Sequence, residues 1–359
     1  MSIKKLTISL LLILTLLIPL SGLAEVVAQD EEVRRYRTLE ERRDAGIKHP
    51  LTDWLEVSPL IELEYNKQRY ITNDSSVSDT TTSETANTFQ LEIVIDPAEW
   101  VNLEIVYEYD HILEEVLLDE AVAEFEREGF KLELGRLTVP FGEYYSRFVT
   151  GPLLEFAETD ARALVLAWEP DDEFEAAVFV LKSKVDKEGD KDNALDWGLS
   201  LNASLTETID VGISYLSDIS ESDDKLLEDN VFYEQKVDGV SAYINVEIGD
   251  FDVSAELVAA LENFAEFETN ANRPRAWNIE FGIYPEGEFE WAFRIEGSDE
   301  LEDEAQLQIG LGSTWHLHKQ VYATAEYLRG RYKTGFVEDD EGEPLNHQKQ
   351  FALQLVVSF

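Results

Sequence analysis

Most of the chain alternates apolar and polar residues with a period of two, which is the pattern of strands that have one apolar and one polar face. The alternation is clearest in FQLEIVID (89–96), VNLEIVYEY (101–109) and WNIEFGIY (277–284). It predicts sixteen strands, beginning near residues 54, 87, 101, 116, 130, 160, 175, 194, 209, 239, 251, 275, 289, 304, 321 and 348. An even number of strands lets both ends of a closed barrel lie on one side.

The connections between the predicted strands are sorted by length. Every second connection is short, at 96–100, 126–129, 169–174, 206–208, 249–250, 285–288 and 316–320. The intervening connections are mostly longer and polar, notably 71–86, 217–238 and 330–347. Short turns on one rim and long loops on the other are typical of outer-membrane barrels. The pattern therefore predicts an all-β, transmembrane antiparallel barrel over residues 51–359, in the outer membrane of a bacterium.

Aromatic residues gather near both ends of the predicted strands. One set lies near the short turns and comprises Trp54, Trp100, Trp168, Tyr284 and Trp315. The other lies toward the long loops and comprises Tyr65, Tyr107, Tyr109, Tyr215 and Tyr327. Amphipathic rings favour the headgroup region of a membrane, so we expect two aromatic girdles in contact with outer-membrane lipid.

The chain ends on an apolar strand, FALQLVVSF, instead of a polar tail. One face of this strand carries Phe351, Leu353, Leu355, Val357 and Phe359. We expect this face to meet lipid and the strand to close the barrel against the first strand, because a membrane barrel leaves no open edge. An alternating apolar strand with a terminal aromatic residue resembles the assembly signal of outer-membrane barrels, which predicts the barrel-assembly machinery as a partner.

The first residues have the features of a secretory signal peptide over 1–24. Lys4 and Lys5 precede an apolar run over 6–20, and small residues follow it. Cleavage after Ala24 is expected; cleavage after Ala28 and an uncleaved anchor helix are the alternatives. Residues 25–50 are predicted to form a periplasmic segment with a short charged helix, for which an oligomerising role is a further alternative.

Composition excludes some classes of function. The net charge of -46 would repel phosphates and excludes ordinary nucleic-acid binding. The absence of cysteine excludes disulfides and thiolate chemistry. Saline surroundings would also account for an acidic surface, because salt screens the repulsion between like charges. The acidity is therefore open to two explanations, selectivity and environment.

The polar face of the predicted strands would line the lumen and is mostly acidic. Its basic members are Lys131 and Arg294. Its carboxylates are Glu62, Glu64, Glu92, Glu104, Glu108, Glu133, Glu247, Glu256, Glu280, Glu290, Glu296 and Glu326. An acidic pore concentrates cations and repels anions, so we expect a channel that prefers cationic or neutral solutes. The alternative is that these carboxylates only solvate the wall.

Residues 135–169 contain the stretch least typical of a barrel wall, in which Pro140 and Gly142 end a regular strand. An extracellular loop made of exposed FVTGPLLEF would be unusual. We expect this loop to fold inward as a constriction or to pack against the mouth, with Arg136, Arg147 and Arg162 facing the acidic wall. A capped extracellular loop is the alternative.

The same stretch carries a family resemblance. Gly135-Arg136, Val139-Pro140-Phe141-Gly142, Ser146, Gly151-Pro152-Leu153 and Glu158-Thr159 resemble a pattern of the siderophore porins related to the legiobactin receptor of Legionella. The resemblance covers roughly residues 45–359; Gly151 stands where Asp is commoner in the family, and Ala157 replaces a Gly. It implies a barrel without a plug domain that takes up ferric siderophores, and an acidic lumen would admit a neutral or cationic complex. The constriction residues predicted here are Arg136, Pro140, Phe141, Gly142, Ser146, Arg147, Pro152, Glu158 and Thr159.

Enzyme and metal sites have little support in the sequence. His316 and His318 stand two apart in a turn, where solvation explains them. Ser146 has no evident base, and no phosphate-binding loop occurs. We therefore predict no catalysis, no metal and no cofactor. The alternatives to siderophore uptake are a general cation-preferring porin for small hydrophilic solutes and an occluded structural or adhesive barrel. The sequence leaves the oligomeric state open, and a homotrimer is one arrangement.

Overall fold

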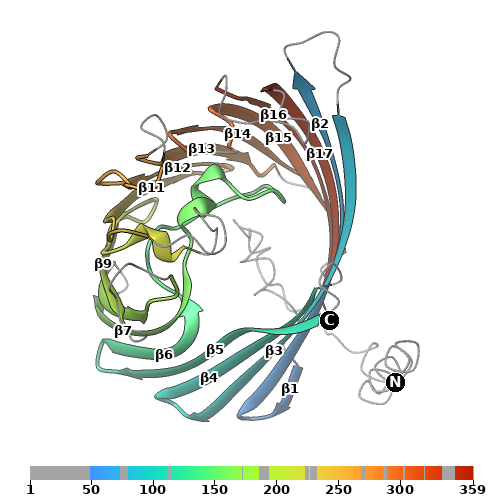
Figure 1. The fold of residues 1–359 in the computed structure, drawn as a ribbon. Helices are drawn as coiled ribbons and strands as arrows, with labels where there is room; N and C mark the ends of the chain where they lie inside the picture. The colour runs from blue at the N-terminus through green and yellow to red at the C-terminus, as the bar shows by residue number, and fades with distance from the viewer. Residues whose placement is uncertain are drawn as a thin grey trace, which may run out of the picture. The chain divides into compact units, whose positions relative to one another are not determined.

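The computed structural model describes residues 49–72, 80–110, 115–171, 173–185, 194–222, 226, 233–267, 272–285, 289–301, 304–318, 320–333 and 344–358. Their strands form one antiparallel sheet, in which consecutive strands pair with each other and β17 (Leu345–Ser358) pairs with β2 (Leu55–Thr72). The sheet is therefore a closed barrel, seen along its interior in Figure 1. The predicted signal peptide, the charged helix and Phe359 lie outside the described residues.

The wall consists of sixteen strands, as the alternation predicted. Between β2 and β17 they are β3 (Thr80–Ala98), β4 (Val101–Asp110), β5 (Glu115–Arg127), β6 (Phe130–Thr138), β7 (Asp160–Asp171), β8 (Phe174–Lys182), β9 (Leu195–Thr206), β10 (Ile209–Leu216), β11 (Gly239–Ile248), β12 (Phe251–Ala260), β13 (Arg275–Ile283), β14 (Phe289–Asp299), β15 (Leu307–His318) and β16 (Val321–Arg331). The prediction that β3 begins near 87 was wrong, because the strand begins at Thr80 and shortens the expected loop.

A short extra strand, β1 (His49–Thr52), forms a hairpin with the beginning of β2. Residues Leu55–Val57 of β2 pair with β1 and also with β3, so β1 must occupy the other edge of β2. That edge is taken up by β17 from Leu60 onward. The hairpin thus continues the closing seam beyond the last described residue of β17.

The two faces of the wall differ as the period of two requires. On β12, Phe251 and Leu257 are exposed on the outer face, whereas Asp252 and Glu256 are buried on the inner face. On β17, Phe351 and Leu353 are exposed in the same way. An apolar outer belt is what a barrel wall needs in hydrocarbon, where the closed ladder pairs the backbone polar groups. Among the described residues, no helix is long and apolar enough to cross a membrane.

Most of the predicted girdle residues lie on the outer face. Trp54, Trp100, Trp168 and Trp315 are exposed near the short turns, and Tyr107, Tyr109 and Tyr327 are exposed toward the other rim. Tyr284 is the exception. It is buried and contributes to the inner site, so its assignment to a girdle was wrong.

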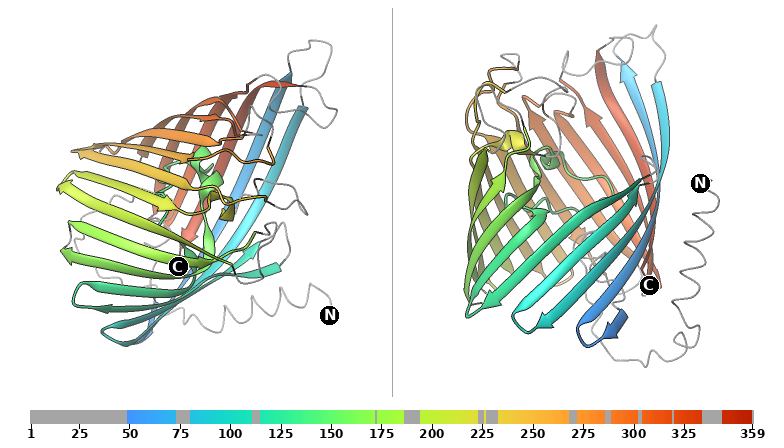
Figure 2. Two further views of the ribbon diagram at one scale, coloured as in Figure 1. Left: turned by 60° about the vertical axis from the view of Figure 1, so that its left-hand side comes forward. Right: turned by 60° about the horizontal axis from the view of Figure 1, so that its bottom comes forward.

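The loops confirm the predicted sorting by length. Two-residue turns join β3 to β4, β5 to β6, β9 to β10 and β11 to β12. The segments at the opposite rim include 139–159, 217–238 and 261–274. Figure 2 shows the strands tilted relative to the barrel axis, with the short turns gathered at one end. By the usual arrangement, the long loops are extracellular and the short turns periplasmic.

Candidate functional site

A long connection between β6 and β7 enters the barrel, and we call residues Val139–Thr159 the inner loop (Figures 1 and 2). Pro140 cannot donate to a strand ladder, and Gly142 has a φ of 85°, a left-handed value that glycine adopts without strain. The Val139 N–H donates to the Thr159 carbonyl at 3.0 Å and closes the base of the loop. A single 3₁₀ turn, η2 (Leu153–Ala157), lies within it.

Four glutamates on the opposite wall accept hydrogen bonds from the backbone of the inner loop. Glu256 of β12 accepts from the N–H groups of Glu143 and Tyr144, each at 2.8 Å. Glu280 of β13 accepts from the Arg147 N–H at 2.8 Å. These carboxylates satisfy backbone donors that would otherwise be buried without partners.

The other two glutamates hold the second half of the loop in the same way. Glu296 of β14 accepts from the Leu153 N–H at 2.7 Å. Glu326 of β16 accepts from the N–H groups of Val149 and Thr150 at 2.6 and 3.0 Å. We call Glu256, Glu280, Glu296 and Glu326 the four anchors. All four are buried, so they reach the loop instead of open solvent.

Arg147 is the cation at the first end of this attachment. Its guanidinium is ion-paired with Asp252 and donates from Nε to the Tyr284 hydroxyl at 2.7 Å. The Tyr284 hydroxyl in turn donates to Asp252 at 2.9 Å. Burial alone would lower the pKa of the Arg147 guanidinium, but the surrounding Tyr145, Tyr284, Asp252 and Glu280 raise the pKa, so the group stays charged.

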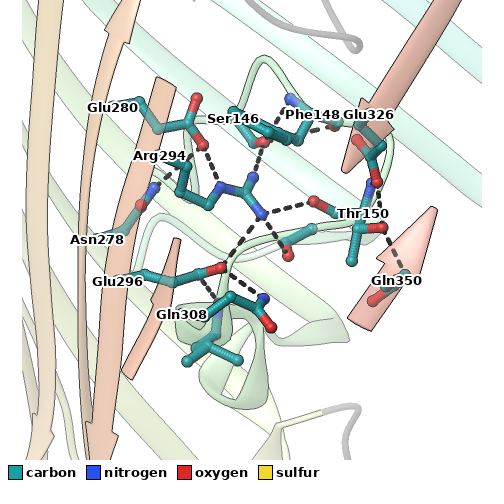
Figure 3. A network of polar contacts seen from close by, with 12 residues as sticks. Ser146, Phe148, Thr150, Asn278, Glu280, Arg294, Glu296, Gln308, Glu326 and Gln350 are labelled. Carbon is teal, nitrogen blue, oxygen red and sulfur yellow. Dashed lines mark hydrogen bonds and ion pairs between the residues drawn. The ribbon is translucent and has the colours of Figure 1, made fainter. Parts of the chain in front are cut away.

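Arg294 of β14 occupies the centre of a second network, shown in Figure 3. Its guanidinium pairs with Glu280 at 2.7 Å and with Glu296 at 3.4 Å. It also donates to the carbonyls of Thr150 and Gly151 at 2.8 and 3.0 Å. One buried cation therefore links two anchors to the inner loop directly.

The ring of Phe148 closes this network against the wall. The Arg294 guanidinium lies 4.3 Å from the ring centroid, within the range of a cation–π interaction. On the wall side, a Cβ added at Gly310 of β15 would be 2.8 Å from the ring, so glycine is needed for this close approach. Arg294 and Phe148 are both almost fully buried.

The other side of the inner loop is apolar and belongs to a buried cluster. Phe141, Leu154 and Phe156 of the loop cluster with small residues on the inner faces of β7 and β8, including Ala163 and Ala177. Residues of the long loops join the same cluster, among them Ile219 of η3 (Ile219–Glu221), Val237 and Phe264. The small wall residues provide the space that the loop fills. The barrel interior beside β7 and β8 is thus packed.

The inner faces of β2, β3 and β4 remain acidic and carry none of the four anchors. Glu64 accepts from Gln354 at 2.7 Å, and Glu108 accepts from Gln90 at 2.7 Å. Glu62, Glu92 and Glu104 share this face, as their pairing partners on neighbouring strands require. Any passage between this wall and the inner loop would therefore have carboxylates on its wall side.

The remaining predicted lumen residues also lie on inner faces. Glu133 of β6 and Glu124 of β5 are within 2.9 and 3.4 Å of the Lys131 ammonium, which reduces the local negative charge. Glu290 of β14 lies 2.7 Å from His316. Glu247 of β11 stands opposite Asp252. A role of these side chains in selecting solutes stays a prediction.

The prediction that Arg136 and Arg162 face the acidic wall was wrong. They stand opposite each other on β6 and β7, and both side chains are exposed on the outer face. Glu133 lies on the inner face, and residues three apart in a strand point to opposite sides. Of the three arginines expected there, the structure brings only Arg147 to the acidic wall. The predicted loop residues Ser146, Pro152, Glu158 and Thr159 do lie in the inner loop.

Asp252 and Tyr284 were missed as site residues. Asp252 shares the inner face of β12 with Glu256, and this parity was the signal that could have found it. Tyr284 has the same parity as Glu280 in the alternating run 277–284, so parity was the missed signal here too.

One group of carboxylates could approach a single cation. Asp196, Asp218 and Glu221 are buried and offer oxygen atoms that lie within 4.8 Å of one another. Asp196 is already paired with the Lys236 ammonium at 2.5 Å. The group lies near the start of β9 and the loop after β10, apart from the four anchors.

Comparison with known proteins supports the fold. No family model matches this sequence, and no curated protein matches it significantly. An anion-selective porin from Comamonas acidovorans is similar in structure, with 10% identity and a TM-score of 0.64 over 85% of this chain and 99% of that chain. OmpF of Salmonella typhi, in complex with daunomycin, has 12% identity and a TM-score of 0.62 over 87% and 100%. The outer membrane channel DcaP of Acinetobacter baumannii has 10% identity and a TM-score of 0.59 over 88% and 99%.

The chain has the porin fold. The apolar outer belt of its closed barrel is suited to hydrocarbon and agrees with a place in the bacterial outer membrane. At these identities the likeness concerns the fold, and the selectivity of each neighbour is its own.

Proposed function

We propose that this protein is a diffusion channel that prefers cations and neutral solutes. The observation that carries the proposal is the division of charge inside the barrel. The two arginines of the inner site, Arg147 and Arg294, are buried in ion pairs with wall carboxylates. The glutamates of β2, β3 and β4 line the facing wall. A permeating ion would thus meet carboxylates and not guanidinium groups, which favours cations.

Planar-bilayer recordings across a KCl gradient test the sign of this selectivity. The wild type is expected to give a reversal potential whose sign corresponds to a preference for K⁺ over Cl⁻. The triple variant Glu92→Gln/Glu104→Gln/Glu108→Gln is expected to move it toward zero, because three carboxylates leave the lumen wall. A matched control is Glu99→Gln/Glu173→Gln/Glu207→Gln, which removes three charges from exposed positions at the short turns. An anion-selective wild type, or equal shifts in both variants, would refute the proposal.

The narrower proposal is uptake of ferric siderophores, and it comes from the sequence resemblance. The matching residues Val139–Gly142 and Gly151–Leu153 lie in the inner loop, the segment that would meet a large solute. The acidic wall favours a neutral or cationic complex. The expected result is concentration-dependent block of the ion current by a cationic ferric siderophore, and no block by an anionic one of similar size. A current unaffected by either complex would leave the general cation-preferring porin as the function.

The same recordings distinguish a channel from an occluded structural barrel, which would show negligible conductance. A trimeric assembly and recognition by the barrel-assembly machinery remain proposals drawn from the fold class and from the apolar last strand. Mass measurement of the purified protein in detergent tests the first. Loss of outer-membrane insertion on removal of Phe359 tests the second.

A further inference from the structure

Three basic side chains form a row across the outer face of β16, β17 and β2, and we call Arg329, Lys349 and Arg69 the basic row. Arg329 stands directly opposite Lys349, and Lys349 directly opposite Arg69. Like charges directly opposite in an antiparallel pair repel each other and destabilise the sheet. The repulsion between these basic side chains therefore destabilises the sheet unless a bound anion offsets the repulsion.

The row belongs to the outer face and not to the lumen. Leu328 and Gly330 flank Arg329 along β16 and are buried on the inner face, as are Gln348 and Gln350 beside Lys349. Arg329 itself is exposed. Arg331 and His347 form the next pair on the same face, toward the long loops, which extends the basic surface.

The level of the row is set by its neighbours along the strands. Toward the short turns, the next outer positions are Tyr327, Phe351 and Lys67, and the level after them holds Ala325, Leu353 and Tyr65. The row thus lies where the apolar belt gives way to polar residues at the extracellular end. On the lipid face, basic side chains are costly at the bilayer midplane and tolerated near the interface. This level is that of the lipid headgroups.

The cross-strand neighbours at the two ends of the row carry no charge. They are Ile309 of β15 and Thr81 of β3. Within the described part of the chain, Arg329 and Lys349 have no ion-pair partner, whereas Arg275 on the outer face of β13 pairs with Asp299 at 2.5 Å. The chain has 75 acidic residues against 29 basic ones, so acids to neutralise the row were not scarce.

We propose that the basic row binds the phosphate groups of anionic glycolipids in the outer leaflet of the outer membrane. A guanidinium and an adjacent ammonium offer several charge-assisted hydrogen bonds to one phosphate. Binding would replace repulsion between like charges by attraction to an anion. The aromatic rings of Tyr327 and Phe351 would lie beside the first carbons of the acyl chains.

Lipid binding to the full mature protein tests this site by native mass spectrometry. The probe is a bisphosphorylated lipid A, and its dephosphorylated analogue is the reference lipid. The wild type is expected to prefer the phosphorylated lipid, with an affinity that falls as salt is added. Arg329→Gln/Lys349→Gln is expected to reduce that affinity at least tenfold. The matched control, Arg127→Gln/Arg275→Gln, also removes two charges, each from an existing ion pair with an acid.

Four results would overturn the proposal. The first two are equal affinity for the two lipids and an equal loss of lipid affinity in the two double variants. The third is displacement of the lipid by inorganic phosphate at the same concentration. The fourth is an unchanged lipid affinity in Arg329→Gln/Lys349→Gln together with loss of self-association. The last result would assign the row to a contact between copies of the chain. The heat-dependent gel shift of a folded barrel verifies each variant, and Lys349→Gln alone serves if the double variant fails to fold.

Discussion

Arg294 donates from Nε to Oε1 of Glu280 across 2.7 Å, and solvent reaches neither side chain (Figure 3). Breaking a buried pair leaves the remaining charge without compensation, which costs about 3–5 kcal/mol. Arg294→Met should therefore lower the unfolding free energy by about that amount. Urea unfolding in detergent measures it. Arg275→Met is the control, because that exposed pair with Asp299 should contribute about 1 kcal/mol or less. Similar losses in the two variants would contradict the buried network.

Removal of one anchor should loosen the inner loop without opening the barrel. In Glu326→Gln an amide replaces the carboxylate that receives the Val149 and Thr150 N–H groups. Each hydrogen bond to a charged group contributes about 1.5–3 kcal/mol, so the loop should sample other positions. Single-channel recordings should show more current noise, while the gel shift of the folded barrel is unchanged. Glu207→Gln in a short turn is the control. Current noise at the wild-type level in Glu326→Gln would show that the position of the loop does not depend on this anchor.

The contact between Phe148 and β15 can be tested with two glycines of the same strand. A Cβ at Gly310 would lie 2.8 Å from the Phe148 ring and 2.5 Å from Leu328, whereas a Cβ at Gly312 would meet the ring at an ordinary 3.4 Å. Gly310→Ala should cost about 1–3 kcal/mol by overpacking. Gly312→Ala should have a smaller effect on the unfolding midpoint. If Phe148→Leu fails to restore part of the stability of Gly310→Ala, the ring is not the cause.

Tyr284 should ionise at an unusually high pH. Burial raises the pKa of its hydroxyl from 10.0 to about 12, with Arg147 acting in the opposite direction. Because the pKa in the folded protein exceeds the ordinary value, the stabilisation by the protonated hydroxyl is complete below pH 10 and is lost as the pH rises through about 12. Absorbance titration at alkaline pH, compared with Tyr284→Phe, should show that the transition missing from the variant lies near 12. A missing transition near 10 would place Tyr284 in solvent.

The local alternation of apolar and polar residues was sufficient to predict the strands of the barrel wall. It was insufficient to predict how the inner loop is held in the lumen. Alternation located β12 because this strand has a continuous apolar face toward lipid. It failed at the start of β3, where Thr80–Ala86 is polar on both faces and contains no apolar repeat. The expectation for Arg136 rested on the clustering of arginines and not on alternation, although the parity of Arg136 relative to Glu133 already required the outer face.

The attachment of the inner loop could not be predicted from the sequence. Glu326 and Glu104 have the same local pattern, an inward glutamate between outward apolar or aromatic residues. Only the three-dimensional path of the loop distinguishes the anchor from the wall carboxylate. The burial of Arg147 likewise depends on Asp252 and Glu280, which lie on other strands.

All four anchors follow the inner loop in the chain, and Glu326 is 177 residues beyond Val149. During biogenesis the backbone N–H groups of the loop therefore stay hydrated until the strands that carry the anchors have folded beside them. Pairing over such a sequence separation is slow compared with local hairpin formation. The lumen should consequently mature last, passing through a wide, unconstricted state before it acquires its final bore.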